Sequence, residues 1–322
     1  MQEYGVERVS RNREIDVLRG IGCVYVVLGH LHPGELEAHI YSFHMFLFFF
    51  LSGYLHKKKT MKAVIISGTK TLLLPFLCAG VLSHIVSLLL HEPIQGNLIQ
   101  SLFYINGELT WNRPIWFLLV LFEATLITHL IERWSFLYIV SIGLCTLYGY
   151  FLQNTNYSFG LSILPVAYSW IGIGYISKKY LSRLFDIEKK YQLLIIMIAA
   201  AANYCCTYRL NTRISVLGSY YGNYIFAFIA GYFGIIMYWF IAKLIARNSM
   251  LETLGKHGVA MLSTQYLILK ILQKISTASF GYDIWREVSL MKAIPVTAAI
   301  SLCYYTIFIV SDRTRKMFNP TT

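Results

Sequence analysis

The sequence predicts an all-α integral membrane protein, a bundle of about ten transmembrane helices with both termini in the cytoplasm. Hydrophobic residues make up 56% of the 322 positions and charged residues only 14%, whereas a soluble domain has about 25% charged residues. The apolar residues gather in runs long enough to cross a bilayer as helices. The Lys and Arg residues fall in short clusters between these runs, a distribution typical of membrane topology signals.

Ten apolar runs define the expected helices. They are 13–31, 40–56, 70–90, 114–132, 136–152, 161–177, 191–208, 220–246, 258–275 and 290–310. Pro114 stands at the start of the fourth run, where proline suits the first turn of a helix. The sixth and ninth runs are short and polar. Because no internal repeat or linker is visible, we expect one domain over 1–322 with a helical core at about 13–312.

The basic residues orient the bundle. With the N-terminus in the cytoplasm, 21 of the 28 Lys and Arg residues fall in cytoplasmic segments, as the positive-inside rule requires. The net charge of +12 is therefore read as topology, and we expect no nucleic-acid partner. The six cysteines all lie in apolar runs, so no disulfide framework is expected. No residues have metal-ligand spacing, and we expect no metal site.

The first run carries three ionisable residues, Asp16, Arg19 and His30. Such groups are unfavourable in hydrocarbon, and those found there are candidate functional residues. Arg19 and His30 are eleven positions apart, about three helical turns plus 20°, so they share a face at a separation of roughly 16 Å. Asp16 lies about 40° from that stripe. A guanidinium and an imidazole so placed are suited to hold the two ends of one long, anionic thioester.

The second and fourth runs bring further polar residues to the bundle. The short connection after the first run makes the first two helices antiparallel neighbours, which favours a shared pocket for His30 and His44. Trp116 and Glu123 are seven positions apart and nearly share a face. Glu123 is expected near mid-membrane, where a carboxylate should face the bundle interior, paired or protonated.

Short motifs along the chain resemble one known family. They are Ile15-Asp16, Leu18-Arg19-Gly20, Gly29-His30, FHMFLFFFLSGYL at 43–55, Lys70 to Pro75, PIWFLLVLF at 114–122 and LGKHGVAML at 254–262. In their order and spacing the chain resembles transmembrane acyltransferase family 3, and within it the fucose 4-O-acetylase-related branch. The resemblance covers most of the chain and is densest over 13–123.

The resemblance implies a membrane enzyme that takes acetyl or other short acyl groups from cytoplasmic acyl-CoA, with acetyl-CoA as the expected donor. It places them on hydroxyls of a cell-surface polysaccharide or lipid-linked glycan, and implies a bacterial inner membrane. By position in the family pattern, Arg19 is tied to the donor and His30 is essential for transfer. Many relatives have a His where this chain has Gln265. Gln can hydrogen-bond but cannot take a proton at neutral pH, so His30 or His44 would do any acid–base work of that position.

The residues themselves suggest a compatible mechanism. Acyl transfer to an alcohol needs a base for the hydroxyl proton and donors for the oxyanion, and His30 is the best base because its ordinary pKa is nearest neutrality. A carboxylate, Glu123 or Asp16, would fix the imidazole tautomer. His44, Tyr41, Ser52 and Trp116 are candidate positioning groups. Candidate cations for the phosphates of the donor are Arg13, Arg19, Lys57, Lys58, Lys59 and Lys70. Direct transfer and a covalent acyl-imidazole both stay open.

Each candidate also has a structural interpretation. Asp16 would pair with Arg19 or cap its helix, and His44 and Glu123 would be interior structural pairs. Lys57 to Lys59 would contact anionic membrane lipids. A transporter or flippase of small molecules or glycan intermediates is the alternative function, with a scaffold without chemistry as a third. Transporters usually show paired repeats with interrupted helices, whereas the polar motifs here crowd into the first 125 residues. Oligomeric state leaves no signal in the sequence.

Overall fold

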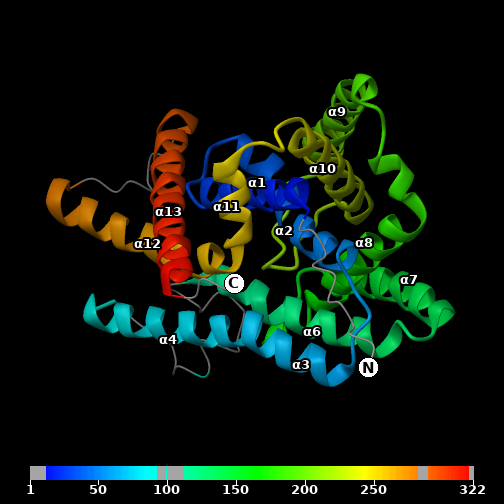
Figure 1. Cartoon of the computed structure of the whole chain (residues 1–322), viewed down its shortest axis with the longest axis horizontal. Coiled ribbons are helices and arrows are strands. Elements are labelled where there is room, and N and C mark those ends of the chain that lie inside the picture. Colours follow the sequence, from blue (N-terminus) through cyan, green and yellow to red (C-terminus); the bar gives the residue numbers. More distant parts are fainter. Residues whose placement is uncertain (1–11, 93–98, 100–111, 282–288, 319–322) are drawn as a thin grey trace.

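The regular structure of the chain is helical. The structure, a computed structural model, describes residues 12–92, 99, 112–281 and 289–318. Its helices are α1 (Arg13–Gly29), α2 (Leu36–Tyr54), α3 (Met61–Gly68), α4 (Leu74–Leu89), α6 (Trp116–Ile131), α7 (Ser135–Phe151), α8 (Leu164–Phe185), α9 (Lys189–Tyr204), α10 (Tyr224–Leu244), α11 (Ser249–Lys256), α12 (Gly258–Phe280) and α13 (Leu290–Phe318) (Figure 1).

Each of the ten predicted runs contains a helix, and the third differs most from its prediction. It begins at Met61 instead of 70, because Thr60 caps it by accepting a hydrogen bond from the Ala63 amide at 3.3 Å. A π-helical turn, Thr69–Leu73, joins α3 to α4 without a break. Pro75 lies in the first turn of α4, where a proline does not remove a needed amide. The lysine-rich segment before 70 is therefore partly helix.

Helix α11 was not predicted from the sequence. Asn248 caps it by accepting a hydrogen bond from the Leu251 amide at 3.0 Å, and His257 separates it from α12. It packs closely against α1, because glycines let the backbones touch. A Cβ on Gly20 would overlap the carbonyl of Leu251, and one on Gly255 would overlap the carbonyl of Asp16. This crossing holds α11 against the part of α1 that carries Asp16 and Arg19.

A second glycine crossing joins α2 to α8. A Cβ on Gly53 would overlap the Ile171 carbonyl, and one on Gly174 would overlap the Phe50 carbonyl. The small-residue positions therefore serve close helix packing. Nearby, aromatic side chains fill the core between the helices, and the Phe46 ring stacks on buried Trp170 with centroids 4.7 Å apart.

A buried polar network holds α1, α2, α9 and α10 together. The hydroxyls of Tyr25 and Tyr238 are 2.6 Å apart. His39 bridges the Tyr238 hydroxyl at 2.9 Å and the side-chain oxygen of Asn203 at 2.8 Å. The Asn203 amide donates to the Ser42 hydroxyl at 3.0 Å. Because Tyr25 lies between Arg19 and His30 on α1, the network positions the second half of that helix.

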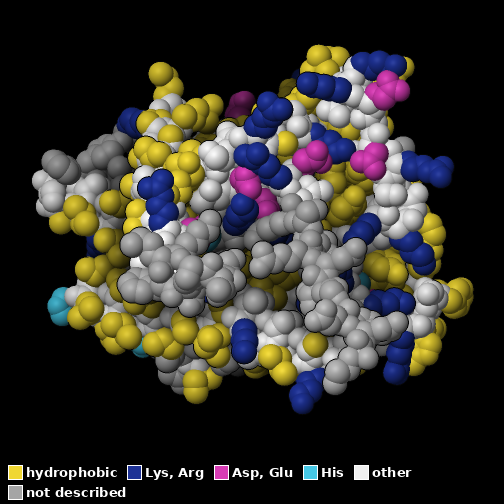
Figure 2. Space-filling model, in the orientation of Figure 1, with side chains coloured by type: hydrophobic (Ala, Val, Ile, Leu, Met, Phe, Trp, Pro, Cys, Tyr) yellow, Lys and Arg dark blue, Asp and Glu magenta, His cyan; other side chains and the backbone are white. Residues whose placement is uncertain are grey.

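The exterior has the character of a membrane protein. Six helical stretches among the described residues are long and apolar enough to cross a bilayer: Met61–Leu89, Arg113–Ile131, Ser158–Arg183, Lys189–Arg209, Tyr224–Leu244 and Leu290–Arg315. The helices of the other four predicted spans, α1, α2, α7 and α12, are shorter or less apolar. Large apolar side chains are exposed along α4 and α13, and they gather over these helices in Figure 2. The chain is a multi-pass membrane protein.

Candidate functional site

A cavity of about 970 Å³ lies between α1, α2, α3, α4, α6 and α12. Its polar lining consists of Arg19, Ser52, His56, Lys57, Lys59, Ser67, Thr71, Thr125, His129, Lys256, His257, Ser263 and Thr264. The rest of the lining is mainly apolar. Its volume is at the upper end of the range for small-molecule and cofactor sites, and four of its lining residues are Lys or Arg. The chemistry suits a long ligand with anionic and apolar parts.

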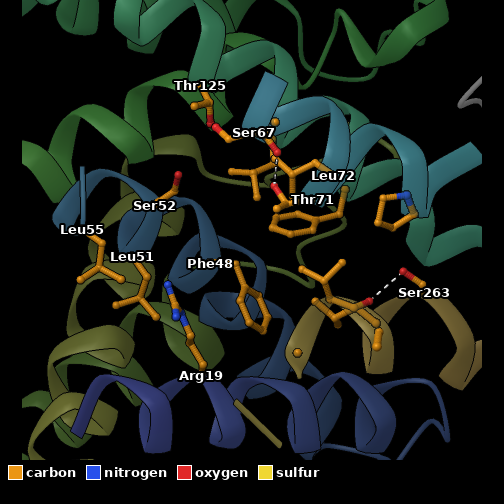
Figure 3. A pocket seen from close by; sticks show the side chains of 18 of the residues that line it. Arg19, Phe48, Leu51, Ser52, Leu55, Ser67, Thr71, Leu72, Thr125 and Ser263 are labelled. Atoms are coloured by element: carbon orange, nitrogen blue, oxygen red, sulfur yellow. Dashed lines mark hydrogen bonds between the residues drawn. The ribbon is translucent and has the colours of Figure 1, made fainter. Parts of the chain in front are cut away.

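Arg19 reaches into this cavity from α1. Figure 3 shows its guanidinium pointing between Leu51 and Phe48 toward the side on which Ser67 and Thr71 lie. Its Nη1 is 3.5 Å from Oδ1 of Asp16, whose side chain is only 2% exposed, against 33% for Arg19. Asp16 is thus too buried to contact a ligand in the cavity and instead positions Arg19. Asn12, not Asp16, caps α1, by accepting from the Glu14 amide at 2.9 Å.

The other predicted donor-binding cations divide into two groups. Lys57 and Lys59 line the cavity, whereas Lys58 and Lys70 are exposed and lie outside its lining. Arg13 also lies outside it and ties α1 to α11. Its Nε is 2.5 Å from a carboxylate oxygen of Glu252, and its Nη2 donates to the carbonyl of Arg247 at 3.1 Å.

His30 lies immediately after α1 among aromatic and basic side chains. The ring of Tyr266, from α12, meets it edge-on with centroids 4.9 Å apart. His44, His32 and Arg113 are close enough to interact with it electrostatically. The structure therefore brings His30 and His44 together, and adds Tyr266 and Arg113, which the sequence did not single out.

His44 has a defined tautomer. Its Nδ1 is 2.7 Å from the carbonyl oxygen of Ile40. A carbonyl only accepts hydrogen bonds, so Nδ1 carries the hydrogen and Nε2 presents a lone pair. Tyr41 packs edge-on against the His44 ring at 5.0 Å. Together His30, His44, Tyr41, Tyr266 and Arg113 form what we call the histidine cluster.

The comparisons with known proteins bear on what this arrangement does. The model of the family Acyl_transf_3, described as "Acyltransferase domain", matches residues 12–311. The chain belongs to the acyltransferase 3 family. It is therefore a membrane enzyme of acyl transfer, which decides against the transporter alternative. No curated protein and no solved structure matches the chain.

The cavity and the histidine cluster of this acyltransferase share α1. Arg19 lines the cavity, and His30 follows the last residue of the same helix. The structure thus combines a cation-lined cavity, suited to an acyl donor, with imidazoles, suited to proton transfer. A second hollow, of about 450 Å³, lies beside Glu37, Tyr208, Arg209 and Arg213.

This second hollow adjoins Tyr41. The guanidinium of Arg213 lies 5.2 Å from the Tyr41 ring centroid and 2.7 Å from a carboxylate oxygen of Glu37. His32 contacts the same carboxylate at 2.9 Å. Because Tyr41 also contacts His44, these groups connect the hollow to the histidine cluster.

The remaining predicted site residues are Glu123, Trp116, Gln265 and Ser52. Glu123 is partly buried, and none of the described residues hydrogen-bonds its Oε2. Trp116 is buried and packs against Phe117. Gln265, next to Tyr266, is fully buried, and both polar atoms of its side chain lack a hydrogen-bond partner in the described part of the chain. Ser52 lines the cavity, as a positioning role requires.

One group of residues was missed entirely in the sequence. His56, His129 and Glu132 meet at the end of α2 and α6. His56 lies outside the helices, and burial lowers its pKa, although Glu132 acts in the opposite direction. The available signal was the spacing of His129 and Glu132, three apart at a helix end, which puts both on one side.

Proposed function

We propose that this acyltransferase transfers an acetyl or other short acyl group from cytoplasmic acyl-CoA, acetyl-CoA in particular, to a hydroxyl of a cell-surface polysaccharide or lipid-linked glycan. It acts as one domain in a bacterial inner membrane, with both termini in the cytoplasm. The observation that carries the proposal is the link through α1 between Arg19 in the cavity and His30 in the histidine cluster.

The donor end is supported by the charges of the cavity. Lys57, Lys59 and Lys256 line it together with Arg19, and the positive-inside rule assigns this end to the cytoplasm. The phosphates of acyl-CoA would bind these cations, with Arg19 favoured for its bidentate fork. The apolar lining would take the pantetheine arm. The thioester end of the donor would then extend alongside α1 toward His30, roughly 16 Å from Arg19.

The chemistry proposed at the histidine cluster is general base catalysis. His30 takes the proton of the acceptor hydroxyl while the oxygen attacks the thioester carbonyl carbon. The carbon–sulfur bond then breaks, and the CoA thiolate takes a proton from the imidazolium. Donors near the reacting centre stabilise the oxyanion, and Arg113 and the hydroxyls of Tyr41 and Tyr266 are available nearby. The proposed step uses no metal ion.

The properties of Gln265 and Glu123 support the assignment of the base to a histidine. That amide cannot take the proton, and Glu123 forms no hydrogen bond or ion pair with the described residues. His44, with its Nδ1 held by Ile40, presents Nε2 toward its surroundings as a second polar group. The acceptor would approach from the side of Tyr41 and Arg213, beside the second hollow. A sugar acceptor agrees with the proposed fucose 4-O-acetylase-related branch.

The deciding experiment measures O-acetyl groups on the surface glycans of the host by NMR. Four strains are compared: wild type, deletion, His30→Ala and Arg19→Ala, with equal membrane expression confirmed. Acetyl signals should vanish in the deletion and in His30→Ala, and fall in Arg19→Ala. If the signals persist without the gene, the proposed acceptor is wrong. If they persist in His30→Ala alone, His30 is not the base.

A further inference from the structure

Three potential metal ligands converge at the inner end of α2 and α6. His56 follows α2, His129 lies in the last turn of α6, and Glu132 follows α6 directly. Nε2 of His56 is 2.6 Å from Oε2 of Glu132, and the two imidazole centroids are 4.3 Å apart. One ligand atom from each side chain falls within 4.8 Å of the others. These residues form what we call the inner triad.

His129 is prepared to act as a ligand. Its Nδ1 donates a hydrogen bond to the carbonyl of Thr125 at 2.9 Å, so Nε2 carries the lone pair. That Nε2 is buried, and no described residue hydrogen-bonds to it. A metal-binding histidine usually has this arrangement, in which one ring nitrogen donates to a fixed acceptor and the other faces the ion.

Among the described residues, no Lys or Arg forms an ion pair with the carboxylate of Glu132. Its side chain is 7% exposed, and its ion pair within the described residues is with His56, itself 5% exposed. The neighbouring Arg133 turns away and stacks on Trp134, 3.7 Å from the ring centroid. Burial of a carboxylate without a paired cation is unfavourable. A bound cation would remove that penalty.

We propose that His56, His129 and Glu132 bind a first-row divalent transition-metal ion, Zn²⁺ in particular. Two imidazoles and one carboxylate are a common ligand set for zinc, with a fourth position left for water or another ligand. His56 and His129 also line the cavity, so the fourth position faces it. The ion joins the end of α2 to the end of α6 beside Lys57.

The geometry accommodates the ion with a small adjustment. Ligand atoms bound to zinc at about 2.0–2.1 Å in tetrahedral geometry lie roughly 3.3 Å apart. The 2.6 Å contact between His56 and Glu132 therefore widens by roughly 0.7 Å. As the ion takes its place, the hydrogen on Nε2 of the neutral His56 ring is given up and one is taken onto Nδ1 by exchange with solvent, so that Nε2 presents a lone pair. His44 and Tyr54, the last residue of α2, are ten positions and roughly 15 Å apart along the helix, and His56 follows beyond Tyr54, so this site is distinct from the histidine cluster.

The test uses the full chain purified in detergent and freed of metal with a chelator. Zn²⁺ is titrated against a competing chromophoric chelator, and Co²⁺ is titrated in parallel, its visible absorption reporting four-coordinate binding. The variants are His56→Gln, His129→Gln and Glu132→Gln. The matched control is His32→Gln, which removes a histidine that also contacts a carboxylate, that of Glu37. Size-exclusion chromatography checks that each variant remains monodisperse.

Wild type and His32→Gln should bind one equivalent of Zn²⁺, and each inner-triad variant should lose stoichiometric binding. If the wild type fails to compete with the chelator, the inner triad is a hydrogen-bonded pair beside a histidine and the proposal is wrong. Undiminished binding by His129→Gln would place the ion elsewhere and also overturn it. Should a variant fail to fold, the wild-type stoichiometry and Co²⁺ spectrum still decide. Neither readout depends on the acyl-transfer reaction.

Discussion

Replacing Arg19 with alanine should weaken binding of the acyl donor. The guanidinium lies in the cavity, one-third exposed, where it can form charge-assisted hydrogen bonds with a phosphate. Such bonds contribute about 1.5–3 kcal/mol. Because every 1.4 kcal/mol is about a factor of ten in binding, KM for acetyl-CoA should rise roughly 10- to 150-fold. The turnover number should change less, since the proposed reaction takes place beside His30, roughly 16 Å along the helix from Arg19.

The substitution has a side effect that the experiment must separate. It removes the contact between Arg19 and the buried carboxylate charge of Asp16, which lowers stability whatever the role of Arg19. The double variant Asp16→Asn/Arg19→Ala removes that charge, so it should regain thermal stability while keeping the raised KM. KM and kcat are measured from the release of CoA thiol, with exposed Lys70→Ala as the control. The reasoning is refuted if Arg19→Ala leaves KM unchanged, or if Lys70→Ala raises it equally.

Three further predictions concern stability. Gly255→Ala should lower the thermal unfolding temperature by forcing α11 from α1, a penalty of about 1–3 kcal/mol, whereas Gly143→Ala, with open space around it, should not. Gln265→Leu should raise the unfolding temperature, since it removes unpaired buried polar atoms. If the amide contacts substrate, the same substitution should lower kcat/KM. A fall in both the unfolding temperature and kcat/KM would refute the stability prediction. Hydrogen bonding to Lys256 and the charge of Arg13 lower the pKa of Glu252. Wild type should therefore be more stable than Glu252→Gln at pH 7, and this difference should disappear as the pH falls below 4.5 and through the lower folded-state pKa. A stability difference that grows in acid would contradict this prediction.

The sequence predicted the helices and the residues on one helix face better than it predicted contacts between helices. Apolar runs located a helix at each of ten positions, and the helical period predicted that Arg19 and His30 share one helix face. The role of Gly255 depends on the backbone of another helix, α1, and no local pattern contains that partner. This is why the packing of α11 against α1 was missed, whereas the earlier start of α3 reflects the local cap by Thr60.

The candidate site shows the same division. Of the predicted donor cations, Lys57 and Lys59 line the cavity, but the sequence could not distinguish them from Lys58, which lies outside its lining. His56 and His129 are 73 positions apart, so the inner triad exists only once α2 and α6 are packed. Tyr266 reaches His30 in the same way, across the junction of α1 and α12.

Arg19 lies within α1 and His30 directly follows its last residue, and this arrangement has a mechanical consequence. An α-helix of this length neither stretches nor shears without breaking its own hydrogen bonds, so α1 keeps the spacing between the two residues fixed. Inserting one residue between the two would rotate one against the other by about 100°, which is a larger disturbance than most side-chain replacements. Under the proposed function, the number of residues between Arg19 and His30 therefore sets the length of the donor that fits between them.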